Sequence, residues 1–393
     1  MNPVFSWKIR VRICDKQPLP HASAWGCRGR RFHFNAIIIT EKKGIIMTDR
    51  KQQFHDIAQG KPGAGHLTAA WEHLVGHEYG AAEFADAYVA FIKRWDWDWV
   101  KINPRAVYYS EAWGAVYDRN DYGDFVIPKT VRAVINEPGD VASIERLDPA
   151  HNDAFEEAVE AARLIREALP DRGVIQTIFS PLSVLLQLAD LPLYPNDTHA
   201  HSKTTVQAAI LDQPDAAKRA LGNIARTLAD YARILVTPTE QGGAGLDGIF
   251  YAVTGTVSEG YFDREQYREF SEPYDRIVID AVREANPDAV VLLHTCRAES
   301  NPEWFDDLGV DVIQWDQYAD GNPKADLDLR AVPVAGANSV EFEPAGSIRQ
   351  VRAELEETLA LRGNAPFLLA PSCTVITPAN DDALAVLAEY RAA

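Results

Sequence analysis

Cysteine and methionine are scarce in this 393-residue sequence, and long apolar runs are missing. The four cysteines, Cys14, Cys27, Cys296 and Cys373, are too few for a disulfide framework in a chain of this length. They suit a reducing compartment and leave thiols free to act as ligands. No apolar run approaches the roughly 20 residues of a membrane span, and the N-terminus lacks the apolar core of a signal peptide. We therefore expect a cytoplasmic protein.

Positive charge is also in short supply, because 39 Lys and Arg residues face 57 Asp and Glu residues, for a formal net charge of −18. A surface of this sign repels phosphate backbones and anionic lipid headgroups, so nucleic acids and membranes are excluded as partners. Small molecules and proteins remain. With 47% hydrophobic residues the chain can bury a large core.

The first 46 residues differ from the rest in charge, with nine Lys and Arg residues against only Asp15 and Glu41. One interpretation is a basic arm for an anionic partner. We favour another, because Met47 opens a segment, MTDRKQQFHDIAQGKP, that is typical of a polar cap, a short helix and a turn. On this interpretation translation begins at Met47, residues 1–46 are an upstream extension without a fold, and residues 47–393 form the domain.

After Met47, short apolar runs rich in β-formers alternate with longer amphipathic segments, as in repeated βα units around a parallel sheet. Eight such units predict a single (β/α)8 barrel, which needs about 250 residues plus insertions. The aromatic and polar segment Ala106–Asp148 fits a loop or hairpin insertion over the C-terminal mouth of the barrel. The candidate strands are His66–Leu74, Trp99–Asn103, Val174–Pro181, Leu246–Val253, Ala289–Cys296, Val310–Asp316, Val332–Asn338 and Pro366–Cys373.

Helical periodicity fills the intervals between the candidate strands. Phe155–Leu169 places its apolar residues on one face, with acidic residues early, as the helix dipole favours. Asp263 and Gln266 predict a capping box for one helix that continues through Ile279. Ser347 is the expected cap of another helix.

One motif suggests a nucleotide cofactor but lies in the wrong context. The stretch from Gly243 to Gly248 matches GxGxxG, the dinucleotide-binding fingerprint. That fingerprint needs a strand before it and a helix after it, whereas here the strand-like IFYAV follows. We interpret it as a loop that enters a strand.

Three soft donors are expected at strand ends. His294 and Cys296 are two residues apart on one candidate strand, so their side chains point to the same face, and Cys373 ends another strand. Active sites of barrels lie at the C-terminal strand ends, and imidazole with two thiolates is a zinc-type ligand set. Asp316 ends a third strand and could serve as a fourth ligand or orient His294. The alternative is that the cysteines are small buried hydrophobic residues.

Several stretches together resemble the uroporphyrinogen decarboxylase superfamily over most of the chain after Met47. The matching stretches are TIFSPLSVLLQLAD, DGIFYAVTG, EQYREFSEPYDRIVIDAV, LLHTCRAES, LGVDVIQWD and PSCTVITPANDDALAVL, in this order. The resemblance implies a (β/α)8 barrel, in agreement with the strand pattern. It also implies one of two chemistries.

The first chemistry is decarboxylation of uroporphyrinogen in tetrapyrrole synthesis, without a cofactor. Those enzymes carry an arginine-rich motif of the form RQAGRY that holds propionates, and the motif is missing here. Arg105 and Arg297 are the nearest substitutes, and we name them as candidate substrate-binding residues. A substrate with many carboxylates needs several cations in its cleft, because unpaired buried carboxylates are costly.

The second chemistry is zinc-dependent methyl transfer to a thiol, as in corrinoid and coenzyme M methyltransferases. Their motif of HxC followed much later by Cys resembles His294, Cys296 and Cys373. Cobalamin-independent methionine synthase uses a similar set with an added Glu, and Asp316 lies near the corresponding place in this sequence, although Asp has a shorter side chain than Glu. The resemblance implies zinc, a methyl-corrinoid donor, a small-molecule thiol acceptor and a corrinoid protein as partner. We favour this chemistry. Decarboxylation is the alternative, and a non-catalytic barrel that binds a corrinoid or tetrapyrrole is a third hypothesis.

Overall fold

Short, wholly buried strands form the centre of this protein. The computed structural model describes residues 49–123, 126–195 and 197–391, so the prediction for residues 1–46 lies outside the described residues. The strands β6, β7, β8, β9 and β10 are buried along their whole length and mostly apolar, as strands covered on both sides are. The barrel strands are β1 (His66–Thr68), β2 (Val100–Ile102), β5 (Val174–Phe179), β6 (Gly248–Thr254), β7 (Val290–Thr295), β8 (Val312–Gln314), β9 (Val332–Ala335) and β10 (Phe367–Leu369).

The sheet follows the order of the chain around a barrel. From β2 the neighbours run through β5, β6, β7, β8, β9 and β10 to β1, and every pair is parallel. β1 and β2 stand at the two ends of this order. They are joined through Asp98, whose backbone N–H donates to the Thr68 carbonyl and whose carboxylate accepts from the Thr68 N–H, each at 2.9 Å. The predicted (β/α)8 barrel is confirmed.

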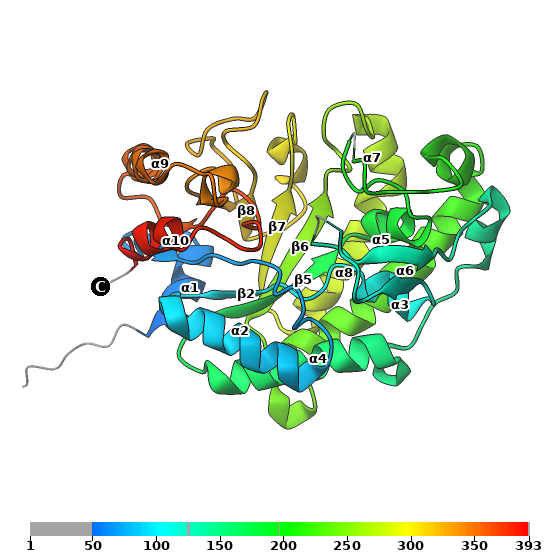
Figure 1. The fold of residues 1–393 in the computed structure, drawn as a ribbon, viewed down its shortest axis with the longest axis horizontal. Coiled ribbons are helices and arrows are strands. Elements are labelled where there is room, and N and C mark those ends of the chain that lie inside the picture. The colour runs from blue at the N-terminus through cyan, green and yellow to red at the C-terminus, as the bar shows by residue number, and fades with distance from the viewer. Residues whose placement is uncertain (1–48, 124–125, 196, 392–393) are drawn as a thin grey trace, which may run out of the picture. The chain divides into compact units, whose positions relative to one another are not determined.

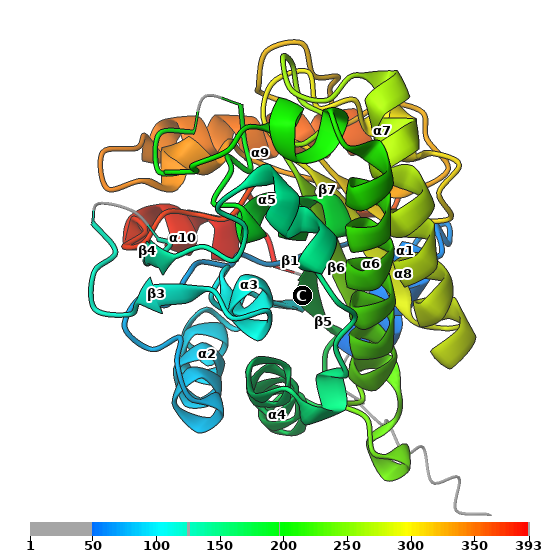
Figure 2. The same cartoon turned by 90° about the vertical axis from the view of Figure 1, so that its right-hand side faces the viewer.

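Helices surround the strands (Figure 1). α2 packs on α4, α6 on α8 and α9 on α10, and Figure 2 shows α6 and α8 side by side. Within the described residues, no helix has both the length and the apolar character that crossing a membrane requires. The helices are α1 (Arg50–Ala58), α2 (Ala81–Trp95), α3 (Tyr108–Ala112), α4 (Asp153–Ala168), α5 (Pro181–Leu188), α6 (Pro214–Val236), α7 (Arg264–Phe270), α8 (Glu272–Ala285), α9 (Ile348–Arg362) and α10 (Asp381–Ala388).

The predicted helix caps are confirmed, but the helix predicted to run from Asp263 through Ile279 is split into α7 and α8. The Asp263 and Gln266 side chains form the capping box of α7, and Ser347 caps α9. The chain breaks at Ser271, because Pro273 in the first turn of α8 has no N–H to donate and hinders a continuous helix. The strand predicted to reach Leu74 ends already at Thr68.

The predicted insertion is a hairpin that reaches the mouth of the barrel. β3 (Val116–Asp118) and β4 (Lys129–Arg132) pair antiparallel. Residues between these two strands, among them Tyr122 and Ile127, line the cavity described below.

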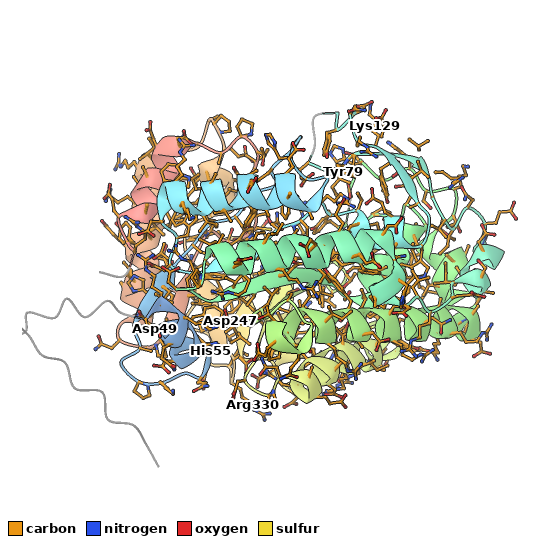
Figure 3. The ribbon with its side chains drawn as sticks, turned by 90° about the horizontal axis from the view of Figure 1, so that it is seen from below. Asp49, His55, Tyr79, Lys129, Asp247 and Arg330 are labelled. Atoms are coloured by element: carbon orange, nitrogen blue, oxygen red, sulfur yellow. The ribbon has the colours of Figure 1, made fainter. Side chains whose placement is uncertain are left out.

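The N-terminal strand ends are closed by ion pairs. Asp247, which precedes β6, accepts from Arg166 at 2.5 Å and from Lys51 at 2.9 Å, and His55 of α1 lies 3.4 Å away. Figure 3 shows Asp49, the N-cap of α1, and His55 of that helix on the same side as Asp247, apart from Tyr79 and Lys129. The GxGxxG stretch is the loop that enters β6, as predicted, and its last glycine, Gly248, is the first residue of that strand. A Cβ on Gly248 would lie 1.9 Å from the Val290 carbonyl oxygen, so this glycine serves strand packing.

Candidate metal centre

A cavity of about 810 Å³ opens at the C-terminal ends of the barrel strands. Side chains from β2, β5, β6 and β7, from the loops after β8 and β10, and from the β3–β4 hairpin line it. The apolar part of its wall includes Phe179, Tyr194 and Phe250. The volume suits an organic substrate, and the position is the one where barrels concentrate their reactive groups.

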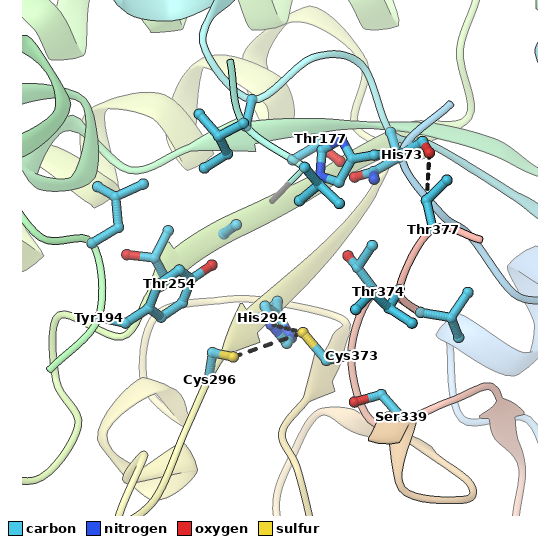
Figure 4. A pocket seen from close by; sticks show the side chains of 18 of the residues that line it. His73, Thr177, Tyr194, Thr254, His294, Cys296, Ser339, Cys373, Thr374 and Thr377 are labelled. Carbon is cyan, nitrogen blue, oxygen red and sulfur yellow. Dashed lines mark hydrogen bonds between the residues drawn. The ribbon is translucent and has the colours of Figure 1, made fainter. Parts of the chain in front are cut away.

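The structure brings His294, Cys296 and Cys373 together on this wall (Figure 4). The Cys373 sulfur lies 3.7 Å from the Cys296 sulfur and 3.7 Å from His294 Nε2. The three donor atoms all lie within 4.8 Å of one another. His294 comes from the end of β7, Cys296 follows that strand directly, and Cys373 lies in the loop after β10. Residues 77 positions apart therefore meet because β7 and β10 point the same way.

The pKa values of the two thiols are shifted in opposite directions. The pKa of Cys373 lies well below that of an ordinary thiol, because the Cys296 thiol donates to its sulfur and His294 and Lys101 lie near. The pKa of Cys296 is raised well above the ordinary value, because it gives this hydrogen bond and is buried. The first proton leaves readily, whereas the second leaves readily only when a cation compensates the second thiolate.

These distances fit a tetrahedral metal ion. Zinc–sulfur bonds of about 2.3 Å and zinc–nitrogen bonds of about 2.0 Å place neighbouring ligands of a tetrahedron roughly 3.5 to 3.8 Å apart. The Cys373 sulfur lies 3.7 Å from each of the other two donors, and the Cys296 sulfur and the nearer His294 nitrogen are within 4.8 Å of each other. Three protein donors leave a fourth position for a substrate, which is the arrangement of catalytic zinc sites.

Asp316 lines the cavity but does not join the three donors. One of its carboxylate oxygens accepts from the Tyr318 N–H at 2.9 Å, and burial raises its pKa. The predicted bond that would orient His294 is not formed, since His294 Nδ1 has no hydrogen-bond partner among the described residues. The local turn after β8 directs this carboxylate toward its own backbone.

The two arginines predicted to bind substrate differ in their surroundings. Both line the cavity, but Arg105 donates to Glu111 at 2.7 Å and also pairs with Glu157. Arg297 is exposed at the mouth and lies over the Tyr194 ring, 4.6 Å from its centroid. Within the described residues, Arg297 forms no salt bridge, so its charge is available to an anionic group.

Sequence reasoning missed a lysine in the cavity. Lys101, in the middle of β2, is 4% exposed, and its Nζ donates to Asn103 Oδ1 at 2.8 Å. The ammonium lies 4.2 Å from the Phe250 ring centroid and 4.9 Å from that of Trp71. Burial lowers the pKa of Lys101 to about 7, while the charges of Cys373 and Cys296 act in the opposite direction. A lysine inside an otherwise apolar strand was the available signal.

Comparison with known proteins agrees with this barrel. The sequence model of the family described as uroporphyrinogen decarboxylase (URO-D) matches residues 79–393. The chain belongs to the uroporphyrinogen decarboxylase family. The chain is 24% identical over 200 residues to the uroporphyrinogen decarboxylases of two strains of Prochlorococcus marinus, which covers 50% of this chain and 53% of theirs. It thus matches about half the length of these curated relatives.

A solved structure shares the fold of this uroporphyrinogen decarboxylase family member. A methyltransferase from Methanosarcina mazei superposes with a TM-score of 0.65 over 87% of this chain and 98% of its own, at 16% sequence identity. At that identity, the likeness establishes the shared barrel.

A second group of polar side chains in the cavity of this family member was also missed. His73 Nδ1 lies 2.9 Å from Glu78 Oε1, and the Tyr122 hydroxyl donates to Glu78 Oε2 at 3.1 Å. His73 and Tyr122 line the cavity, and Glu78 is buried behind them. The carboxylate holds one ring nitrogen of His73, which fixes the orientation of the imidazole.

Proposed function

We propose that this protein is a zinc-dependent methyltransferase that moves a methyl group from a methyl-corrinoid to the sulfur of a small-molecule thiol. The observation that carries the proposal is the convergence of the His294, Cys296 and Cys373 donors within 4.8 Å at the C-terminal strand ends. Zinc bound there would lower the pKa of a thiol ligand, so that the thiol reacts as a thiolate. The donor in the cell would be presented by a corrinoid protein.

The residues of the site suit this role. Two cysteine thiolates would balance the double charge of the metal, and neutral His294 adds no charge. The Phe250 ring lies 5.4 Å from the His294 ring, centroid to centroid, and shields one side of the group. Exclusion of water on that side strengthens the electrostatic interactions of a bound thiolate.

Decarboxylation of uroporphyrinogen, the activity named for the curated relatives, is the alternative. The available cations disfavour it. Arg105 is already paired with Glu111 and Glu157, and in the part of the chain that the structure describes only Arg297 and Lys101 line the cavity without a carboxylate partner. A non-catalytic carrier, the third hypothesis, would have no use for three converging metal donors.

The test is zinc analysis of the full chain purified without chelators, together with thiol-dependent demethylation of methylcobalamin. We expect about one zinc per chain in the wild type, and less than roughly a tenth of that in Cys373→Ser, because a neutral hydroxyl replaces a thiolate poorly. Asp316→Asn is the matched control, since this residue lines the same cavity outside the three donors, and it should keep nearly all the zinc.

Two results would contradict the proposal. One is wild-type protein without zinc, or both Cys296→Ser and Cys373→Ser with full zinc. The other concerns the fourth position: if a thiol leaves the absorption spectrum of the cobalt-substituted protein unchanged, the metal is structural and no substrate reaches it.

A further inference from the structure

Lys101 is a buried amine without a carboxylate partner. Among the described residues, no Asp or Glu forms a salt bridge with it, although its side chain is 4% exposed. Its contacts are the Asn103 amide oxygen and the faces of two aromatic rings. A permanent, unpaired ammonium at such depth would be costly, so this position needs an explanation.

The surroundings accommodate both protonation states of the amine. The Phe250 and Trp71 rings and the Asn103 oxygen stabilise an ammonium through cation–π contacts and one hydrogen bond. A carboxylate partner, which would hold the group permanently charged, is missing among the described residues. The pKa of Lys101, lowered to about 7, agrees with this balance. The ionisable groups whose charges act on it are Cys373 and Cys296.

The same amine shares a cavity with the candidate metal centre. Lys101, Cys296 and Cys373 line one cavity, and the Phe250 ring contacts both the Lys101 ammonium, at 4.2 Å, and the His294 ring, at 5.4 Å. A thiol that enters this cavity must lose a proton before its sulfur can attack a methyl group. Arg297 cannot accept that proton, because a guanidinium stays charged at every physiological pH.

From this arrangement, and resting on the thiol methyl transfer proposed above, we infer that Lys101 accepts the proton of the incoming thiol. The S–H bond breaks, its electron pair stays on sulfur as the thiolate, and the lone pair of the amine forms the new N–H bond. The charge of the cavity is unchanged overall, because ammonium and thiolate form together. This avoids the cost of burying a net charge. After the neutral thioether leaves, the ammonium loses its counterion and releases the proton to solvent.

Proton counting tests the inference independently of turnover. The zinc-loaded full chain is titrated calorimetrically with 2-mercaptoethanol at pH 8, in Hepes and in Tris, whose ionisation enthalpies differ. Wild-type protein should release close to zero protons per thiol bound, because neutral Lys101 takes the proton up. Lys101→Met and Lys101→Arg should each release about one, since neither side chain can accept a proton at this pH. Lys93→Met, on the exposed face of α2, is the control and should behave as the wild type.

The comparison between the two Lys101 variants also separates charge from proton transfer. Arginine keeps a positive charge, so a purely electrostatic role would leave Lys101→Arg like the wild type, which would overturn the inference. Release of about one proton by the wild type would overturn it as well. Release near zero in all proteins would assign the proton to another group, with His73 the first candidate. If the wild type holds no zinc or gives no heat with the thiol, the methyl-transfer function fails first, and this inference falls with it.

Discussion

The thiol pair is the most informative feature at the scale of single residues. Cys373 is partly exposed to the cavity and Cys296 is buried, yet their sulfurs are 3.7 Å apart. One of them carries the lowered pKa and the other the raised pKa, so the two cysteines should differ in reactivity as well as in position.

We predict that Cys373 of the metal-free protein is alkylated by iodoacetamide well below the pH at which free cysteine reacts. The reason is that the thiolate is the nucleophile and the Cys373 thiolate persists to lower pH. Cys296 should react at least about tenfold more slowly. Peptide mass spectrometry across pH 5 to 9 measures both rates and separates them from Cys14 and Cys27. Equal rates at the two positions would contradict the hydrogen-bonded pair, and zinc should protect both.

Residue positions were predictable from sequence, but side-chain directions were only partly so. The two-residue spacing of His294 and Cys296 correctly placed them together. The strand predicted to end at Cys373 ends already at Leu369, and Cys373 reaches the other two donors from the loop that follows β10. The same reasoning predicted that the Asp316 carboxylate would bind the metal or orient His294. Instead, the carboxylate accepts a hydrogen bond from the Tyr318 N–H in the turn after β8. Lys101 was missed because a lone lysine in a short strand gives no periodic signal.

At the scale of elements, Asp247 joins α1, α4, β5 and β6. Its carboxylate pairs with Lys51 and Arg166, lies near His55, and accepts from the Val174 N–H at 2.9 Å. Burial works against ionisation of Asp247. The contacts with His55, Arg166 and Lys51 outweigh it, so that the pKa lies below the ordinary value.

Asp247→Asn should lower the free energy of unfolding by about 3 kcal/mol at pH 7, because it leaves buried Arg166 without its charge partner. A lowered folded-state pKa stabilises above the unfolded pKa of about 3.9, and this contribution is lost as the pH falls below it. The difference between wild type and variant should therefore shrink toward pH 3. Urea unfolding measures it, with exposed Asp86→Asn as control. An equal difference at pH 7 and pH 3 would exclude this ion cluster as its source.

Asp275 gives the opposite pH dependence. It is fully buried in α8, accepts from Tyr251 at 2.6 Å and from Ser271 at 2.9 Å, and burial raises its pKa to about 7. The folded state then holds a proton that the unfolded state has lost, so stability falls as the pH rises from about 4 to about 7. Asp275→Asn, which is never charged, should lack this fall. Denaturant unfolding at pH 5 and pH 8 measures this difference in the wild type and the variant. If the stability of the variant falls with pH as much as that of the wild type, Asp275 is not the source of the fall.

At the scale of the whole molecule, charge separates the two family chemistries. The chain carries a net charge of −18, and Arg105 in the cavity wall is already paired with carboxylates. We predict conversion of uroporphyrinogen to coproporphyrinogen at less than about a thousandth of a typical enzyme rate, in an anaerobic assay with product chromatography. Substantial turnover would mean that Arg297 and Lys101 suffice to hold the propionates, and the proposed function would have to be replaced.

The barrel itself was predictable because its signals are local and repeated. Each apolar run marks a strand buried on both faces, and the alternation of eight runs with amphipathic segments leaves one common architecture. What escaped prediction depends on tertiary context. The predicted helix breaks at Ser271 because of Pro273, although the apolar pattern on both sides favours a continuous helix. The strand β1 is shorter than predicted, and the loop that follows it leads to His73 in the cavity wall.

The placement of β1 beside β10 has a consequence during synthesis on the ribosome. β1 leaves the exit tunnel before the other strands of the barrel, but its ladder partner Phe367–Leu369 is the last barrel strand to emerge. For most of translation the nascent chain therefore exposes unpaired strand edges at β1 and at the growing end of the sheet, which are sites of aggregation. A chain stalled before Phe367 lacks β10, so it cannot pair β1 and cannot close its barrel.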